Sequence, residues 1–259
     1  MLAEEKPYLD VQLKTKNVYH QQKQKNNLLN YFMSDYNRSE QAKEVFVEKA
    51  KPKRDIKYKI SLSEEQKEAK RAILENKVTI LYGAAGTSKT TVAAITALDM
   101  LHKKEVDRIT LVRPTVATED IGYLPGDVGD KMKNWFTPVL ENLNDIYDKA
   151  SVEKYLKEGA LRFLPLQFAQ GVNFKNEVAI FEEAENATEV QIRMILTRIC
   201  SGAKVIFTGD MAQVQLPKYA ESGFAKLISI CDKVDGMTCF ELTENRRDPI
   251  VKQILEHYQ

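Results

Sequence analysis

One stretch of the chain, Gly83-Ala84-Ala85-Gly86-Thr87-Ser88-Lys89-Thr90, combines small residues with an ammonium group and a hydroxyl group in a pattern that suits phosphate chemistry. Backbone N–H groups in such a turn point inward at anionic oxygens, and a following helix adds the positive end of its dipole. Lys89 is then placed to reach the outer phosphates, and the Thr90 hydroxyl to ligate magnesium. The alternative is a small-residue loop that only precedes a core helix.

The context favours the phosphate-binding interpretation. An apolar run, 78–82, precedes the turn, and a helix-compatible run, 91–98, follows it, which is the strand–turn–helix order of a P-loop. Ser88 stands where the motif has glycine, and a positive φ there costs a residue with a Cβ about 1–2 kcal/mol. The predicted ATP-binding residues are Gly83, Ala84, Ala85, Gly86, Thr87, Ser88, Lys89, Thr90 and Thr91, with Gln66 upstream.

Gln66 has two interpretations. It can close a capping box with Ser63 at the start of a helix that runs to about Glu75. Its amide could instead read an adenine edge, because it offers both a donor and an acceptor. The sequence leaves the two alternatives open.

Two adjacent carboxylates follow a second apolar run. Residues 178–181 are apolar on both faces, as in a central parallel strand, and Glu182 and Glu183 come directly after them. Ligands of open α/β sheets bind beyond the carboxyl ends of the strands. We therefore expect Glu182 to hold magnesium and Glu183 to activate the attacking water, while Gln213, after the next strand, senses the γ-phosphate. A solvated strand end is the alternative for the pair.

Several basic residues are candidates for nucleic-acid contacts. Lys131 and Lys133 lie beside Trp135, a combination that suits single-stranded RNA or DNA, and Arg113 ends a predicted strand at 108–112. A core tryptophan with solvated lysines is the alternative. Arg246 and Arg247 follow the last predicted strand and are candidates for an arginine finger, or else form a surface pair.

Composition indicates a soluble intracellular protein. Among 259 residues 43% are hydrophobic, the formal net charge is +1, and no apolar run is long enough to span a membrane. Residues 1–60 hold a surplus of five positive charges, so the remainder carries a surplus of four negative ones. Cys200, Cys231 and Cys239 lack metal-site spacing, and we expect reduced core thiols in a cytoplasm, the host's if the chain is phage-encoded.

The order of elements predicts an α/β fold. Strands and helices alternate from residue 61 onward, which favours a single doubly wound parallel sheet of the P-loop NTPase type. A short strand is also expected over 55–60. Residues 1–60 are expected to form a basic, helical N-terminal extension, with Pro52 ending its helices, and 61–259 the nucleotide-binding domain.

From about Ser61 to Gln259 the chain resembles the PhoH-like family, a branch of RecA-like P-loop ATPases related to superfamily 1 helicases. The matching stretches are the P-loop, Arg113-Pro114, 121–127, 181–186, 196–199, 208–213, Leu216-Pro217, Ser222-Gly223 and Arg246-Arg247. The chain departs from the family at Ser88 for Gly, Glu182 for Asp and Glu185 for Gln.

The resemblance implies ATP hydrolysis, a link to RNA, and homo-oligomeric rings, often hexamers. The residues themselves predict Mg²⁺ as the cofactor and no association with a membrane. Our leading hypothesis is an ATPase or helicase-like motor that acts on RNA or single-stranded DNA. We expect an oligomer in which Arg246 or Arg247 completes a neighbour's ATP site. A kinase or ribonuclease on the same scaffold, and a non-hydrolysing nucleotide switch, are the alternatives.

Overall fold

The computed structural model describes residues 56–114, 128–216, 221–245 and 250, and at 128–135 it describes the backbone alone. The chain divides into two compact units. The account below concerns the unit of residues 48–119 and 138–259; of the other, residues 1–47 and 120–137, the structure describes only the beginning of one helix. The predicted boundary at residue 60 stays a prediction.

A six-stranded sheet, parallel throughout, forms the centre of the described unit, which confirms the predicted fold class. Its strand order is β3-β2-β4-β5-β1-β6, so β5 separates the P-loop strand β1 from the carboxylate strand β4. The strands are β1 (Val78–Tyr82), β2 (Arg108–Arg113), β3 (Leu161–Pro165), β4 (Glu177–Phe181), β5 (Lys204–Gly209) and β6 (Met237–Glu241).

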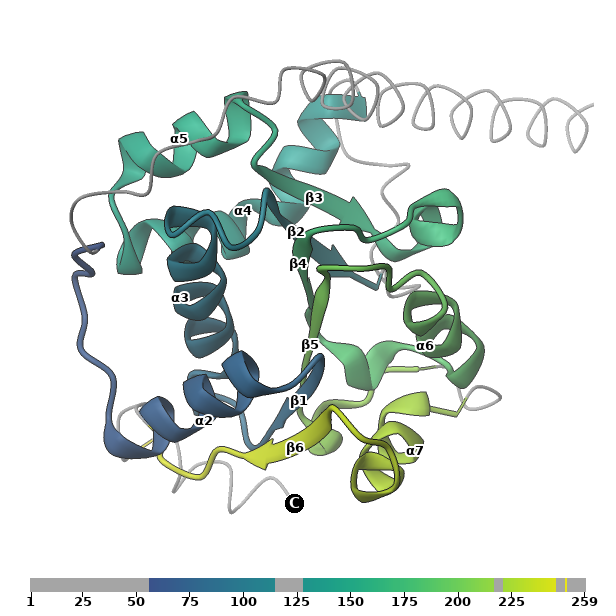
Figure 1. Cartoon of the computed structure of the whole chain (residues 1–259). Helices are drawn as coiled ribbons and strands as arrows, with labels where there is room; N and C mark the ends of the chain where they lie inside the picture. The colour runs from purple at the N-terminus through teal and green to yellow at the C-terminus, as the bar shows by residue number, and fades with distance from the viewer. Residues whose placement is uncertain (1–55, 115–127, 217–220, 246–249, 251–259) are drawn as a thin grey trace, which may run out of the picture. The chain divides into compact units, whose positions relative to one another are not determined.

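Helices cover both faces of this sheet, with α2 and α3 on one face and α6 and α7 on the other (Figure 1). The helices are α2 (Glu64–Glu75), α3 (Lys89–His102), α4 (Val128–Ile146), α5 (Lys149–Lys157), α6 (Glu189–Leu196) and α7 (Gly223–Ser229). Short 3₁₀ turns are η1 (Leu166–Gly171), η2 (Ala184–Asn186), η3 (Met211–Gln213) and η4 (Cys231–Lys233). None of the helices among the described residues is long and apolar enough to cross a membrane.

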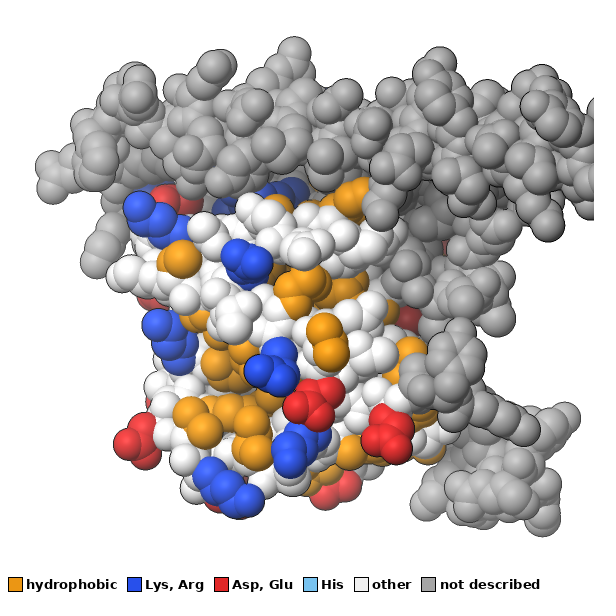
Figure 2. All heavy atoms as spheres, turned by 90° about the vertical axis from the view of Figure 1, so that its right-hand side faces the viewer, with side chains coloured by type: hydrophobic (Ala, Val, Ile, Leu, Met, Phe, Trp, Pro, Cys, Tyr) orange, Lys and Arg blue, Asp and Glu red, His pale blue; other side chains and the backbone are white. Residues whose placement is uncertain are grey.

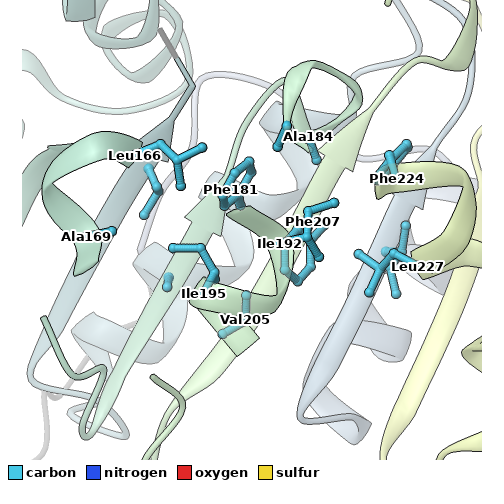
Figure 3. Close-up of a cluster of buried hydrophobic side chains, with 14 of the residues drawn as sticks. Leu166, Ala169, Phe181, Ala184, Ile192, Ile195, Val205, Phe207, Phe224 and Leu227 are labelled. Carbon is cyan, nitrogen blue, oxygen red and sulfur yellow. The ribbon is translucent and has the colours of Figure 1, made fainter. Parts of the chain in front are cut away.

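The core between the sheet and α6 and α7 holds the carboxyl ends of β4 and β5 in place. All five residues of β4 are buried, and the Phe181 and Phe207 rings lie 5.3 Å apart between centroids. Ile192 and Ile195 of α6, with Phe224 and Leu227 of α7, complete the cluster in Figure 3. Burial of each of these side chains contributes about 1.5–3 kcal/mol, so the strand ends that carry the predicted carboxylates are rigidly supported.

The strand expected over 55–60 is wrong, because residues 56–60 belong to no strand. Their polar groups bond to helices instead. The Tyr58 hydroxyl donates to the Ile95 carbonyl at 3.0 Å and to Asp99 Oδ1 at 2.6 Å, and the Lys59 amide donates to the Ile146 carbonyl at 3.0 Å. Polar and apolar residues alternate in this segment because one of its sides faces helices. None of the described strands pairs with it.

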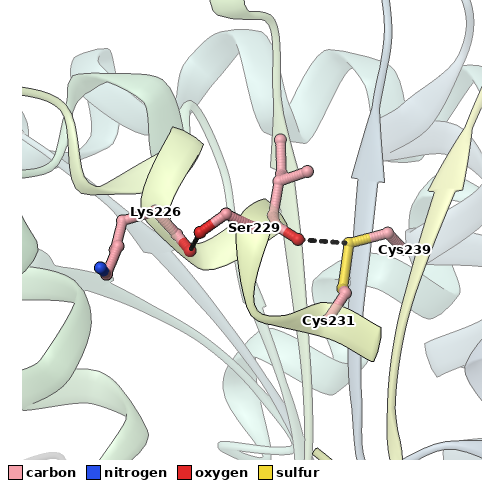
Figure 4. The surroundings of a disulfide bond; sticks show 5 residues. Lys226, Ser229, Cys231 and Cys239 are labelled. Carbon is pink, nitrogen blue, oxygen red and sulfur yellow. Dashed lines mark hydrogen bonds between the residues drawn. A yellow bond between two sulfur atoms is a disulfide. The ribbon is translucent and has the colours of Figure 1, made fainter. Parts of the chain in front are cut away.

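The expectation of three reduced cysteines is also wrong. Cys231, at the start of η4, and Cys239, in β6, form a disulfide with Cα atoms 6.0 Å apart (Figure 4). Cys200 is a free thiol. The two half-cystines are eight positions apart in the sequence, and between them the chain turns back from α7 into the edge strand. The bond therefore ties β6, the neighbour of the P-loop strand, to the helical layer.

We expect the Cys231→Ser/Cys239→Ser double variant to lose about 2–3 kcal/mol in the free energy of unfolding, because the disulfide restricts a short loop in the unfolded chain. Urea denaturation of the non-reduced protein measures this loss, with Cys200→Ser as the matched control. Thiol titration in denaturant should count one thiol without reductant and three with it. Three thiols in both samples would contradict the bond.

Candidate functional site

The P-loop lies between β1 and α3 and adopts the backbone that its glycines permit. Ser88, the residue before α3, has φ 65° and ψ 25°, so the left-handed conformation anticipated at this position is present despite its Cβ. Gly83 has φ 143°, and a Cβ there would overlap the Leu242 carbonyl oxygen. Only glycine fits at 83, because the segment after β6 packs directly against this end of the loop.

Lys89 lies folded against its own loop. Its ammonium group donates to the carbonyl oxygens of Gly83 at 2.7 Å and Ala84 at 2.9 Å. The Thr87 hydroxyl also donates to the Ala84 carbonyl, at 2.9 Å. The ammonium group that is predicted to bind the phosphates therefore lies against the carbonyl oxygens at the beginning of the loop.

The two predicted metal ligands meet in space. Glu182 follows β4, is 6% exposed, and lies close enough to the Thr90 hydroxyl on α3 for that hydroxyl to lower its pKa. Burial raises the pKa of Glu182 to about 7; the nearby Arg113 charge and the Thr90 hydroxyl lower this pKa, and the Glu183 charge raises it. A buried carboxylate beside a hydroxyl at a P-loop offers two oxygen ligands to Mg²⁺, which usually takes one or two carboxylates together with substrate phosphates and water.

Glu183 is paired with Arg113. The residue has φ 51° and ψ 43°, a left-handed conformation that turns the chain away from the strand direction into η2. Its carboxylate accepts a hydrogen bond from the Arg113 guanidinium, which is 15% exposed at the end of β2. The Glu182 amide donates to the Val112 carbonyl at 2.8 Å and keeps β2 beside the end of β4. This pairing was not anticipated, because it depends on the adjacency of β2 and β4.

Glu185 and Gln213 border a second polar cluster around Asp210. Glu185 is 4% exposed, and its Oε2 accepts from the Asp210 amide at 3.2 Å. Burial raises the pKa of Glu185 to about 7; backbone hydrogen bonds lower it, and the Glu183 and Asp210 charges raise it further. The Gln213 amide is exposed and donates to Asp210 Oδ2 at 2.5 Å, so Asp210 holds the predicted phosphate sensor.

Gln66 takes part in the capping box at the start of α2. The side-chain Oε1 of Gln66 accepts from the Ser63 backbone amide at 3.1 Å, and the Gln66 backbone amide donates to Ser63 Oγ at 3.3 Å. The side chain is 2% exposed. The capping alternative is therefore realised, while the reading of adenine by Gln66 stays a prediction.

Other predicted residues fall outside the described part of the chain. Arg246 and Arg247 are not described, and neither are the side chains of Lys131, Lys133 and Trp135. On the face that carries α6 and α7, Lys and Arg side chains lie scattered among hydrophobic ones (Figure 2). Within the described residues there is no group of three or more His, Cys, Asp or Glu side chains that could hold a metal.

Comparison with known proteins adds a family. The family model described as PhoH-like protein matches residues 59–259. A PhoH-like protein of Bacillus subtilis is 35% identical over 196 residues, covering 74% of this chain and 61% of that protein. Protein PhoH of Escherichia coli K12 is 31% identical over 214 residues, covering 81% and 60%. The chain thus spans about 60% of the length of these curated relatives.

Solved structures resemble the chain more distantly. The large terminase of a thermophilic bacteriophage covers 77% of this chain with a TM-score of 0.48 and 14% identity, matched over 51% of the terminase. The UvsW helicase of bacteriophage T4 covers 73% with a TM-score of 0.46 and 15% identity, matched over 64% of the helicase.

Glu185→Gln should change stability in a pH-dependent way. A carboxyl whose pKa rises on folding favours the folded state below its unfolded pKa, and this benefit disappears as pH rises through the folded pKa near 7. Glutamine cannot ionise, so its free energy of unfolding does not carry this pH dependence. We therefore expect the free energy of unfolding of the variant, relative to that of wild type, to be up to about 2–3 kcal/mol higher at pH 8 than at pH 5.

Denaturation curves at both pH values test this shift, with the exposed Glu189→Gln as the matched control. If the free energies of unfolding of wild type and Glu185→Gln differ by the same amount at pH 5 and at pH 8, the pKa of Glu185 is not raised by folding.

Proposed function

Because the chain belongs to the PhoH-like protein family, we propose that it binds ATP with Mg²⁺ and hydrolyses it in an oligomer that acts on RNA or single-stranded DNA. The observation that carries the proposal is the convergence of the P-loop Thr90 with the buried Glu182 of β4. A loop that merely preceded a core helix would not require a buried carboxylate against its hydroxyl. Burial of that charge is costly, which favours a functional reason for it.

Each residue of the site has a role in this proposal. Backbone N–H groups of 83–90 and the Lys89 ammonium bind the phosphates, and Thr90 and Glu182 would hold the magnesium ion. Bound Mg²⁺ supplies positive charge that stabilises the transferring phosphoryl group. Glu183 orients the attacking water and accepts its proton. Gln213, held by Asp210, reports the state of the γ-phosphate through the end of β5.

The Arg113–Glu183 ion pair supports dependence on a nucleic acid. Arg113 is both a predicted nucleic-acid contact and the partner of the proposed catalytic carboxylate. A polymer phosphate that drew the guanidinium away would leave Glu183 free to engage water. The same cation thereby links occupancy of the polymer site to hydrolysis.

A non-hydrolysing nucleotide switch is the second candidate, favoured by the αL serine at 88 and by Glu182 in place of the family's aspartate. The longer side chain shifts the metal ligand relative to the phosphates. In a switch, Glu183→Gln would leave the low turnover unchanged, whereas in an ATPase it removes the base.

We expect ATP hydrolysis by the wild-type protein to rise with single-stranded RNA or DNA, and Lys89→Ala to lower turnover by about a hundredfold or more, since it removes a charged phosphate ligand. Steady-state phosphate release with each polymer measures both effects. Lys103→Ala, at the far end of α3, is the matched control and should behave as wild type.

Equal residual turnover in wild type, Lys89→Ala and Glu183→Gln at every polymer would contradict the ATPase and support the switch. Shortening of end-labelled RNA without ATP would instead indicate a ribonuclease.

The oligomer makes a separate prediction. If Arg246 or Arg247 acts in a neighbour's site, mixing inactive Lys89→Ala with inactive Arg246→Ala/Arg247→Ala should restore part of the activity, because mixed rings contain complete sites. Asn245 contacts the P-loop of its own copy at the Ala85 carbonyl, so action within one copy is the alternative. Light scattering with ATP present reports the assembly. No recovery on mixing, or a fully active monomer, would contradict action between copies.

A further inference from the structure

The segment after β6, Leu242–Asn245, runs along the base of the P-loop, and we call it the strap. The Leu242 amide donates to the Tyr82 carbonyl at 2.8 Å, which extends the pairing of β6 with β1 to the point where the loop begins. The Leu242 carbonyl oxygen occupies the space that a Cβ at Gly83 would need. In Figure 1 the chain leaving β6 passes beside the beginning of α2.

A single carboxylate on α2 fastens the middle of the strap. Glu65 Oε1 accepts from the Thr243 amide at 2.8 Å and from the Thr243 hydroxyl at 2.6 Å, and Oε2 accepts from the Glu244 amide at 3.0 Å. Partial burial raises the pKa of Glu65, but these three hydrogen bonds together lower it below its ordinary value. The carboxylate is therefore ionised at neutral pH, and charge-assisted hydrogen bonds of this kind are the stronger ones.

The far end of the strap reaches the phosphate loop itself. The Asn245 side-chain amide donates to the Ala85 carbonyl at 3.2 Å. Leu242 is buried, but Thr243, Glu244 and Asn245 are exposed. Because these three residues place no side chain in the core, hydrogen bonds rather than packing determine where the end of the strap lies.

We propose that Glu65 is a positioning residue of the nucleotide site, which holds the strap so that Leu242 and Asn245 fix the Gly83–Ala85 half of the P-loop for phosphate binding. The proposal rests on the proposed ATP-binding function. Its physical basis is preorganisation: a loop whose backbone is already held loses less conformational freedom when the ligand binds. Glu65 also precedes Gln66, so one turn of α2 both begins the helix and anchors the loop's support.

The test measures the Kd of a fluorescent ATP analogue with Mg²⁺ for wild type, Glu65→Gln and Glu64→Gln. Glu64 is the matched control, because it is the preceding residue of the same first turn and forms an ion pair with Lys67 one turn along the same helix. We expect Glu65→Gln to weaken binding about fivefold, the equivalent of about 1 kcal/mol, and Glu64→Gln to leave the Kd unchanged. Thr243→Val, which removes one of the three hydrogen bonds, should weaken binding about twofold.

Two further readouts separate positioning from a general loss of stability. Hydrogen exchange of the nucleotide-free protein should become faster at 83–86 in Glu65→Gln but stay unchanged along the rest of α2. The double variant Glu65→Gln/Asn245→Ala should bind the ATP analogue no more weakly than the single variant with the higher Kd, because both residues act through the strap.

The outcomes also separate the inference from the function on which it rests. Wild type that binds the analogue, with Glu65→Gln and Glu64→Gln giving the same Kd, overturns the inference alone. Additive losses in the double variant overturn it as well, because Glu65 and Asn245 would then act independently. Wild type that binds no analogue overturns the proposed function and the inference together.

Discussion

The concentration of negative charge just beyond β4 is the constraint on which the rest of the site depends. Glu182, Glu183 and Glu185 lie within four residues, and the first and last are buried. Each needs a compensating group, because buried carboxylates without hydrogen bonds or opposite charges are costly. The structure supplies a guanidinium from β2 for Glu183, a hydroxyl from α3 for Glu182 and a backbone amide after β5 for Glu185. Three neighbouring elements are thereby held to the end of one strand.

The parallel sheet makes this arrangement possible at small cost. Because every strand points the same way, the ends of β1, β2, β4 and β5 lie at one edge of the sheet, and residues at or just after these ends can contact one another. Groups from several segments therefore compensate the three carboxylates, which no single loop could do alone. The compensation is incomplete, as the raised pKa values of Glu182 and Glu185 indicate. This surplus of negative charge agrees with the proposed binding of a metal–nucleotide complex, because such a complex brings a cation to the site.

Residue patterns predicted the fold well where the determinants are local. Apolar runs located the strands of the sheet, the small-residue turn located the P-loop, and the serine–glutamine spacing located the start of α2. Patterns failed where a contact depends on how the chain folds back or on which strands are neighbours. The Arg113–Glu183 pair needs the order β2-β4, the Cys231–Cys239 bond needs the turn from η4 into β6, and the contacts of Glu65 span 178 residues. No spacing rule reports such neighbours.

In the proposed ATPase, the two departures at Ser88 and Glu182 would act on different steps of the nucleotide cycle. Ser88 already adopts the left-handed backbone that the loop requires, so the cost of its Cβ, about 1–2 kcal/mol, is borne by the folded protein before any ligand arrives. Phosphate binding therefore need not overcome it. Glu182 is different: with a pKa of about 7 it is partly protonated near neutrality, and in the proposed ATPase a magnesium ion would displace that proton. Metal affinity should consequently rise with pH across this range, whereas the conformation of the phosphate loop should not change.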